Sequence, residues 1–167
     1  MFKKKAYVVY PMYGVCKVVT FEKHKFDDKN IDFYVLECEM ENIVLKVPVD
    51  SVKTMGIRKI ISRAEASEFL KMLQRKPTDI EDNWKIRYQE NVDKLKTGRI
   101  KEAIEVARGL FIRNRFKELS SSEKRLYEKA YQFIVDEISI ALKKDKEFIE
   151  DIVSSALEKS AKKFEHR

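Results

Sequence analysis

The spacing of hydrophobic residues changes once along the chain, near residue 58. Before that point, apolar and polar residues alternate with a period close to two, as in strands that bury one face. After it, apolar residues recur every three or four positions, as on one face of a helix. The pattern predicts two modules: a β module over residues 1–58 and a helical module over residues 59–167.

The β module contains short segments rich in β-branched and aromatic residues, separated by polar links. So many strands in fewer than 60 residues favour a small twisted antiparallel barrel, which its own side chains would fill. A polar stretch over residues 23–30 is interpreted as a hairpin loop. The predicted strands cover residues 6–10, 14–22, 31–40 and 42–50, with a possible fifth within 51–60.

The helical module shows five amphipathic segments. Two of them begin with the capping-box pattern, in which a serine precedes a glutamate by three residues: Ser62 with Glu65, and Ser120 with Glu123. The predicted fold class is therefore α+β, a small N-terminal antiparallel β-barrel followed by an all-α domain of about five helices.

The second of the five helical segments is predicted to begin near Asp82 and to end at Gly98, a residue type that favours helix C-termini. Its predicted buried stripe contains Tyr88, Val92 and Leu95. The chain's single tryptophan, Trp84, falls in the first turn. Its spacing permits either burial one turn before Tyr88 or exposure toward a partner.

Composition excludes several classes of protein. Hydrophobic residues make up 44% of the chain, enough for a folded core, yet no run of about 18 uncharged apolar residues could span a membrane. The N-terminus lacks a signal-peptide cleavage pattern, so we expect a cytoplasmic protein with Cys16 and Cys38 as buried free thiols.

Catalytic and cofactor motifs are absent from the sequence. The two histidines, His24 and His166, lie far apart, and no metal-binding spacing, phosphate-binding glycine loop or nucleophile elbow is present. We therefore expect no enzyme activity, no metal and no cofactor.

The positive charge is concentrated in one stretch. The chain carries a net charge of +7, and residues 85–129 alone hold 13 Lys/Arg against 7 Asp/Glu. A basic cluster of this kind is typical of a nucleic-acid surface, although lysine-rich helices are also common in proteins that bind no nucleic acid.

Several stretches in order resemble the CarD/CdnL family of bacterial transcription regulators. They are "VVYPMYGVCKVV", "FYVLEC", "LKVPVDSVKTMGIRKIIS", "NWKIRYQENVDKLKTGRIKEAIEVARGL" and "LSSSEKRLYEKAYQFIVDEISIAL". The resemblance covers about residues 7–142. The β module is also similar to the polymerase-interacting domain of the transcription–repair coupling factor.

This resemblance implies that the barrel is of the Tudor/SH3-like kind and that it binds the β subunit of RNA polymerase. It implies that the helical domain contacts promoter DNA in the minor groove, at the upstream edge of the transcription bubble, and stabilises the open complex. Trp84 would act as the wedge at that edge. The residues implied for DNA contact are Trp84, Lys85, Arg87, Arg113, Arg115, Lys124 and Arg125, and those implied for polymerase contact are His24 and Lys46.

Two positions depart from the family pattern, because Ile86 and Gln89 stand where basic residues are common. We therefore expect weak DNA binding with little sequence specificity. We also expect a monomer that reaches the nucleoid through RNA polymerase. The alternative is a protein–protein adaptor in which Trp84 anchors an interface with another protein.

Overall fold

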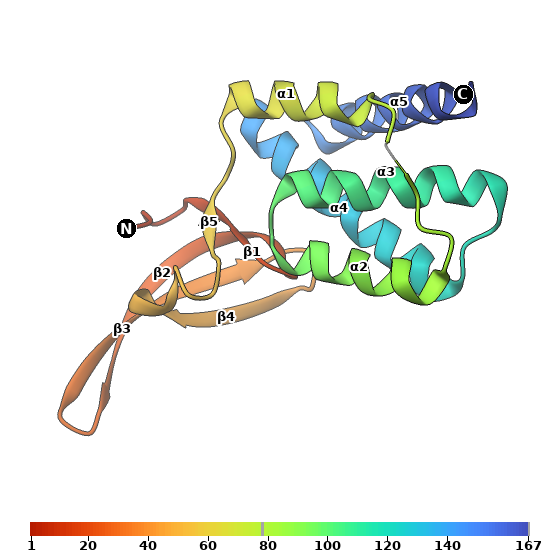
Figure 1. Ribbon diagram of the computed structural model, residues 1–167. Coiled ribbons are helices and arrows are strands. Elements are labelled where there is room, and N and C mark those ends of the chain that lie inside the picture. The colour runs from red at the N-terminus through yellow and green to blue at the C-terminus, as the bar shows by residue number, and fades with distance from the viewer. Residues whose placement is uncertain (78, 167) are drawn as a thin grey trace. The chain divides into compact units, whose positions relative to one another are not determined.

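The computed structural model describes residues 1–77 and 79–166, and the chain forms two compact units, Met1–Ile60 and Ile61–Arg167. The boundary lies two residues after the change of hydrophobic period near residue 58. The first unit is a β module and the second is helical (Figure 1). The architecture therefore agrees with the predicted α+β class.

The first unit is a five-stranded antiparallel sheet with the strand order β4-β3-β2-β1-β5. Its core contains the fully or almost fully buried Val8, Val18, Tyr34, Leu36 and Val47. A short 3-10 turn, η1, joins the last two strands. The bounds are β1 Tyr7–Tyr10, β2 Gly14–Phe26, β3 Lys29–Cys38, β4 Ile43–Pro48, η1 Val49–Ser51 and β5 Arg58–Lys59.

The hairpin of β2 and β3 is longer than the sequence pattern predicted. Residues 23–30 form the end of a continuous ladder, not a loop, and the strands remain paired as far as Phe26 and Lys29 (Figure 1). The connection is a two-residue turn, in which Asp27 adopts a φ of 51°. Aspartate tolerates this left-handed conformation, so the chain reverses without glycine.

The prediction of free thiols is wrong, because Cys16 and Cys38 form a disulfide. They are direct partners in the β2–β3 register, with their Cα atoms 4.2 Å apart. The register includes an irregularity between Val18 and Thr20. Alternation of residue types does not reveal such a shift, so the sequence pattern could not place the two cysteines opposite each other.

The described residues of the second unit form five helices. The helices α3 and α4 make its most extensive helix pair, and Ile104, Leu110, Ile134 and Ile138 are fully buried. None of the helices within residues 1–77 and 79–166 is long and apolar enough to cross a membrane. The bounds are α1 Arg63–Leu73, α2 Trp84–Lys96, α3 Ile100–Phe116, α4 Ser121–Leu142 and α5 Lys146–Glu165.

The buried face of α2 differs from the predicted one. Leu95 is buried as expected, and Gly98 follows the helix with a positive φ of 71°. Tyr88 and Val92 are only half-buried, however, and the positions that turn fully inward are Arg87 and Asn91. The inner face thus carries two polar residues before Leu95, and the predicted stripe was one residue too late at both of those positions.

Candidate functional site

Trp84 is an exposed residue at the first position of α2, with 59% of its surface accessible. The preceding Asn83 caps the helix, because its side-chain oxygen accepts hydrogen bonds from the backbone N–H groups of Lys85 and Ile86. The ammonium of Lys85 lies 5.7 Å from the indole ring. Burial in a core is therefore excluded, and the indole is accessible to a partner.

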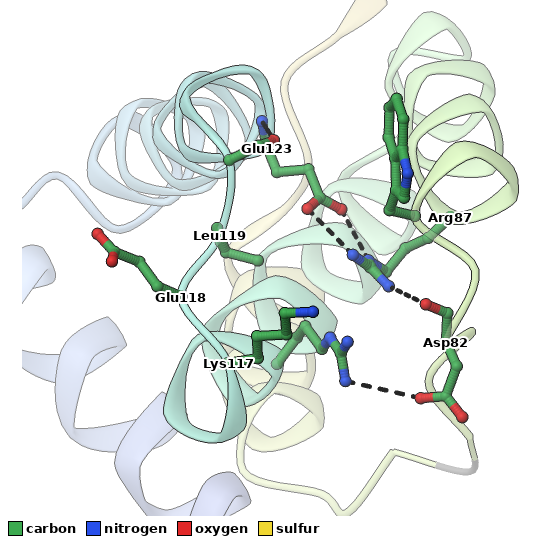
Figure 2. Close-up of a pocket in the computed structure, with 9 residues that line it drawn as sticks. Asp82, Arg87, Lys117, Glu118, Leu119 and Glu123 are labelled. Atoms are coloured by element: carbon green, nitrogen blue, oxygen red, sulfur yellow. Dashed lines mark hydrogen bonds and ion pairs between the residues drawn. The ribbon is translucent and has the colours of Figure 1, made fainter.

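The indole borders a cavity of about 310 Å³ between the start of α2, the end of α3 and the start of α4. Figure 2 shows Arg87 and Glu123 on one side of this cavity and Lys117 on another. Its walls combine an aromatic ring, cations and carboxylates. The lining residues are Asp82, Trp84, Arg87, Arg113, Lys117, Glu118, Leu119, Ser120 and Glu123.

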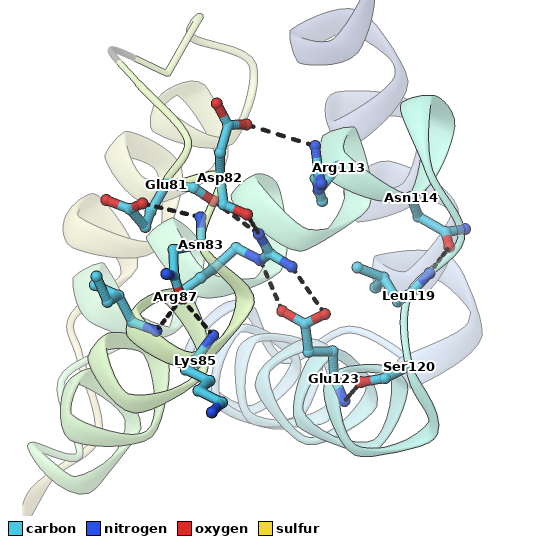
Figure 3. A network of polar contacts seen from close by, with 11 residues as sticks. Glu81, Asp82, Asn83, Lys85, Arg87, Arg113, Asn114, Leu119, Ser120 and Glu123 are labelled. Atoms are coloured by element: carbon cyan, nitrogen blue, oxygen red, sulfur yellow. Dashed lines mark hydrogen bonds and ion pairs between the residues drawn. The ribbon is translucent and has the colours of Figure 1, made fainter.

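Arg87 does not fit its predicted role as a DNA contact, because it is only 6% exposed. Its Nε lies 2.7 Å from Oε1 of Glu123, and a second guanidinium nitrogen donates to Oε2 at 3.0 Å. The remaining nitrogen donates to the backbone carbonyls of Glu81 and Asp82, at 2.8 and 3.0 Å (Figure 3). This guanidinium is committed within the protein, and we assign it a structural role.

Glu123 explains why the second capping box is incomplete. The Ser120 hydroxyl accepts from the Glu123 backbone N–H at 3.2 Å, as predicted, but the Glu123 carboxylate binds Arg87. At the start of α1, by contrast, Ser62 and Glu65 form both bonds of the box. A signal for this difference exists in the sequence: Glu123 falls on the apolar stripe of α4, three residues before Leu126, where a carboxylate needs a buried partner.

The other predicted DNA contacts lie nearer the surface, and most of them already pair with carboxylates. Arg113 lies 3.6 Å from Asp82 on the loop before α2. Arg115 pairs with Glu158 and Glu165 on α5, and the hydrogen bond that it donates to Glu158 raises the pKa of the guanidinium.

At the start of α4, Lys124 pairs with Glu118 at 2.6 Å, and hydrogen bonding from this lysine lowers the pKa of the Glu118 carboxyl. Arg125, the next residue, is exposed. The first turn of α4 therefore presents two accessible cations, and one of them is held by a neighbouring carboxylate.

In the β module, the two predicted polymerase contacts share one carboxylate. The Lys46 ammonium lies 2.9 Å and the His24 Nε2 lies 2.7 Å from Oε2 of Glu22. The hydrogen bond from Lys46, followed by that from His24, lowers the pKa of Glu22. Lys46 points outward between Leu45 and Val47, as its alternation predicted, and the His24 ring packs edge-on against Phe33 at 5.2 Å.

Glu22 was missed by the sequence analysis, because only the pairing of β2, β3 and β4 brings it to Lys46. Glu22 and His24 are two residues apart on β2, so they share a face of the sheet. Lys46 reaches that face from β4, across β3. Within residues 1–77 and 79–166, no group of three or more His, Cys, Asp or Glu residues is placed to hold a metal ion.

Comparison with known proteins gives matches over both units. Residues 2–61 match the family model described as the CarD-like/TRCF RID domain, and residues 68–154 match the one described as CarD, C-terminal domain. The "Putative transcription factor YdeB" of Bacillus subtilis (strain 168) is 30% identical over 133 residues, which cover 80% of this chain and 87% of that protein. The first match agrees with the predicted Tudor-like β module.

Proposed function

Because the chain belongs to the CarD family of transcription factors, we propose that it regulates initiation by binding RNA polymerase and promoter DNA at the same time. The β module would bind the polymerase β subunit. The helical unit would contact DNA at the upstream edge of the melted region and prolong the life of the open complex. The observation that carries this proposal is the accessible Trp84 at the start of a basic helix.

The polymerase contact is assigned to the face and edge of the sheet around Lys46. The sheet ends in two edge strands: β5 has two residues, whereas β4 has six. An exposed edge of six residues can pair with a partner strand through backbone hydrogen bonds. The Lys46 and His24 side chains both contact the Glu22 carboxylate, and they could exchange it for a carboxylate on the polymerase.

The DNA contact is assigned to Trp84 and the accessible cations near it. An apolar or aromatic side chain can enter a base step and stabilise unstacked DNA, while neighbouring cations hold phosphates. The retained set is Lys85, Arg113, Arg115, Lys124 and Arg125, without Arg87. Three of these cations are paired with carboxylates, which supports weak binding to free DNA.

A first experiment separates the two contacts. Lys46→Glu places a second carboxylate beside Glu22 and should weaken binding to RNA polymerase, while the affinity for free DNA should not change. Lys23→Glu is the matched control, because it makes the same charge change one residue from His24, on the opposite face of β2. Equal loss of polymerase and DNA binding in Lys46→Glu would contradict this division.

A second experiment tests whether the helical unit binds DNA at all. If about four cations meet phosphates, the logarithm of affinity should fall against the logarithm of salt with a slope of roughly −3 to −4. A chain that joins polymerase without any salt-dependent affinity for DNA would instead be an adaptor between proteins, with Trp84 and the exposed Ile86 as the contact.

The same two contacts also set the oligomeric state and the cellular location that we propose. A single chain carries both contacts, so a monomer suffices. Binding to RNA polymerase would bring it to the nucleoid in the bacterial cytoplasm.

A further inference from the structure

We infer that the buried pair of Arg87 and Glu123 is a positioning device for Trp84: it fixes the turn that starts α2 and ties that turn to the first turn of α4. The inference concerns how the tryptophan is held, and its value for transcription rests on the proposed function. Arg87 is a positioning residue here, since its guanidinium is buried inside the protein and cannot reach DNA or another protein.

Arg87 holds two segments at once. Its bidentate contact reaches Glu123, the third residue of α4, and its third nitrogen donates to the carbonyls of Glu81 and Asp82. Those carbonyls belong to the segment immediately before the Asn83 cap. Figure 3 shows the guanidinium lying between this segment and the Glu123 carboxylate. The path of the backbone into Trp84 is therefore set from inside the protein.

Trp84 depends on this path more than a core residue would. An indole that is 59% exposed has little packing against neighbours to restrict it. The cation on its ring, Lys85, is itself an exposed side chain. What remains to set the direction of the indole is the backbone turn that carries it, and a contact group works only when its supporting residues hold it closely.

The same pair connects the two parts of the proposed DNA surface. Lys124 and Arg125 directly follow Glu123 on α4, while Lys85 directly follows Trp84 on α2. Glu123 and Arg87 thus set the spacing between the tryptophan and the cations of α4. If this spacing changes, the tryptophan and the cations no longer match the same stretch of DNA, even though each remains on the surface.

If the pair only stabilised the fold, its replacement by a well-packed apolar pair would leave Trp84 unaffected. Replacing a buried ion pair by apolar residues of similar volume is often neutral or stabilising. Arg87→Met with Glu123→Leu should therefore preserve folding. The methionine cannot donate to the carbonyls of Glu81 and Asp82, however, so the double variant removes the positioning contacts and keeps the packing.

The test uses the chain's single tryptophan as its own probe. In the folded double variant we expect lower fluorescence anisotropy of Trp84, stronger quenching by acrylamide, and a promoter complex whose lifetime falls about fivefold or more, as when a base contact is lost. Polymerase binding should not change. Wild-type anisotropy and quenching in a folded double variant would overturn the inference.

Two further variants keep the result unambiguous. Lys94→Met with Glu105→Leu removes an ion pair of 3.3 Å that also joins α2 to another helix, but at the far end of α2, and it should leave Trp84 fluorescence unchanged. If the apolar double variant does not fold, Arg87→Lys decides: a lysine keeps the charge but cannot form the forked contact, so Trp84 should again become more mobile. Unchanged Trp84 fluorescence in folded Arg87→Lys would then reject the inference.

Failure of the proposed function would look different. In that case Trp84→Ala itself would leave the promoter complex unaffected, while the fluorescence of the double variant would still report whether the pair positions the indole.

Discussion

The two units place a carboxylate beside basic side chains in opposite environments. In the β module, Glu22 lies on an accessible face between Lys46 and His24. In the helical unit, Glu123 is 2% exposed and is bound to Arg87, which is 6% exposed. The geometry of the contacts is similar, with nitrogen–oxygen distances from 2.7 to 3.0 Å.

Burial, and not charge, decides which of these basic side chains can serve a partner. An accessible lysine exchanges one carboxylate for another at little energetic cost, since exposed ion pairs contribute little to stability. A buried arginine cannot leave its carboxylate, because an uncompensated charge would remain inside the protein. Lys46 is therefore suited to recognition, and Arg87 is suited to holding a structure in place.

The largest difference between the two units should appear when each carboxylate is removed in turn. Glu123→Ala should lower the free energy of unfolding of the helical unit by about 3–5 kcal/mol, because Arg87 would stay buried without a partner. Glu22→Ala should leave the stability of the β module unchanged within error, because both of its partners can turn to water. Urea unfolding, followed by Trp84 fluorescence and by circular dichroism, measures both, and similar losses in the two variants would contradict the comparison.

The sequence predicted the general architecture well, because that depends on periodicity and local signals. The change of period near residue 58, the capping serines at 62 and 120, and Gly98 at the end of α2 are all properties of neighbouring residues. The outward direction of Lys46 followed from simple alternation along one strand.

What the sequence could not provide depends on pairing between distant segments. The Cys16–Cys38 disulfide requires the register of two strands, and the Arg87–Glu123 pair joins residues on different helices. Arg87 lies in a basic stretch, so it resembled its surface neighbours. A charged residue on the buried stripe of a helix indicates that it has a buried partner, and Glu123 lies on the same stripe as Leu126.

The disulfide lies within the β module and should stabilise that unit alone. It closes a loop with a sequence separation of 22 residues, which corresponds to about 3 kcal/mol by the chain-entropy estimate. Reduction should therefore speed hydrogen exchange of the β2–β3 amides and leave the Trp84 unfolding transition unchanged. The paired variant Cys16→Ala with Cys38→Ala controls for the reductant, and insensitivity of the β module to both would contradict the expectation.

The smallest expected effect concerns Glu118, which holds Lys124 at the start of α4. Glu118→Gln removes a negative charge next to the proposed DNA surface and should raise the affinity for free DNA modestly, with a steeper salt dependence. The control is Glu68→Gln, which removes a similar exposed carboxylate from the Glu68–Lys71 pair on α1.

The pH dependence of that gain has a defined sign. Because pairing lowers the pKa of Glu118, its carboxylate stays charged until the pH falls through that depressed value, where the pair is lost. The advantage of the glutamine variant should therefore be largest at neutral pH and shrink in acid. Affinity that is equal to the wild type at neutral pH would show that Lys124 takes no part in binding.

The proposed role of Trp84 is tested by the lifetime of the promoter open complex with Trp84→Ala, measured after a competitor is added to preformed complexes. Removing an exposed side chain should shift the unfolding free energy by no more than about 0.5 kcal/mol. Loss of one base contact, worth about 1–3 kcal/mol, should shorten the lifetime by roughly 5- to 150-fold. Phe148→Ala, which removes an exposed aromatic side chain from α5, should leave the lifetime unchanged. A Trp84→Ala complex as long-lived as the wild-type complex, formed by a folded variant that still binds polymerase, would contradict the central claim.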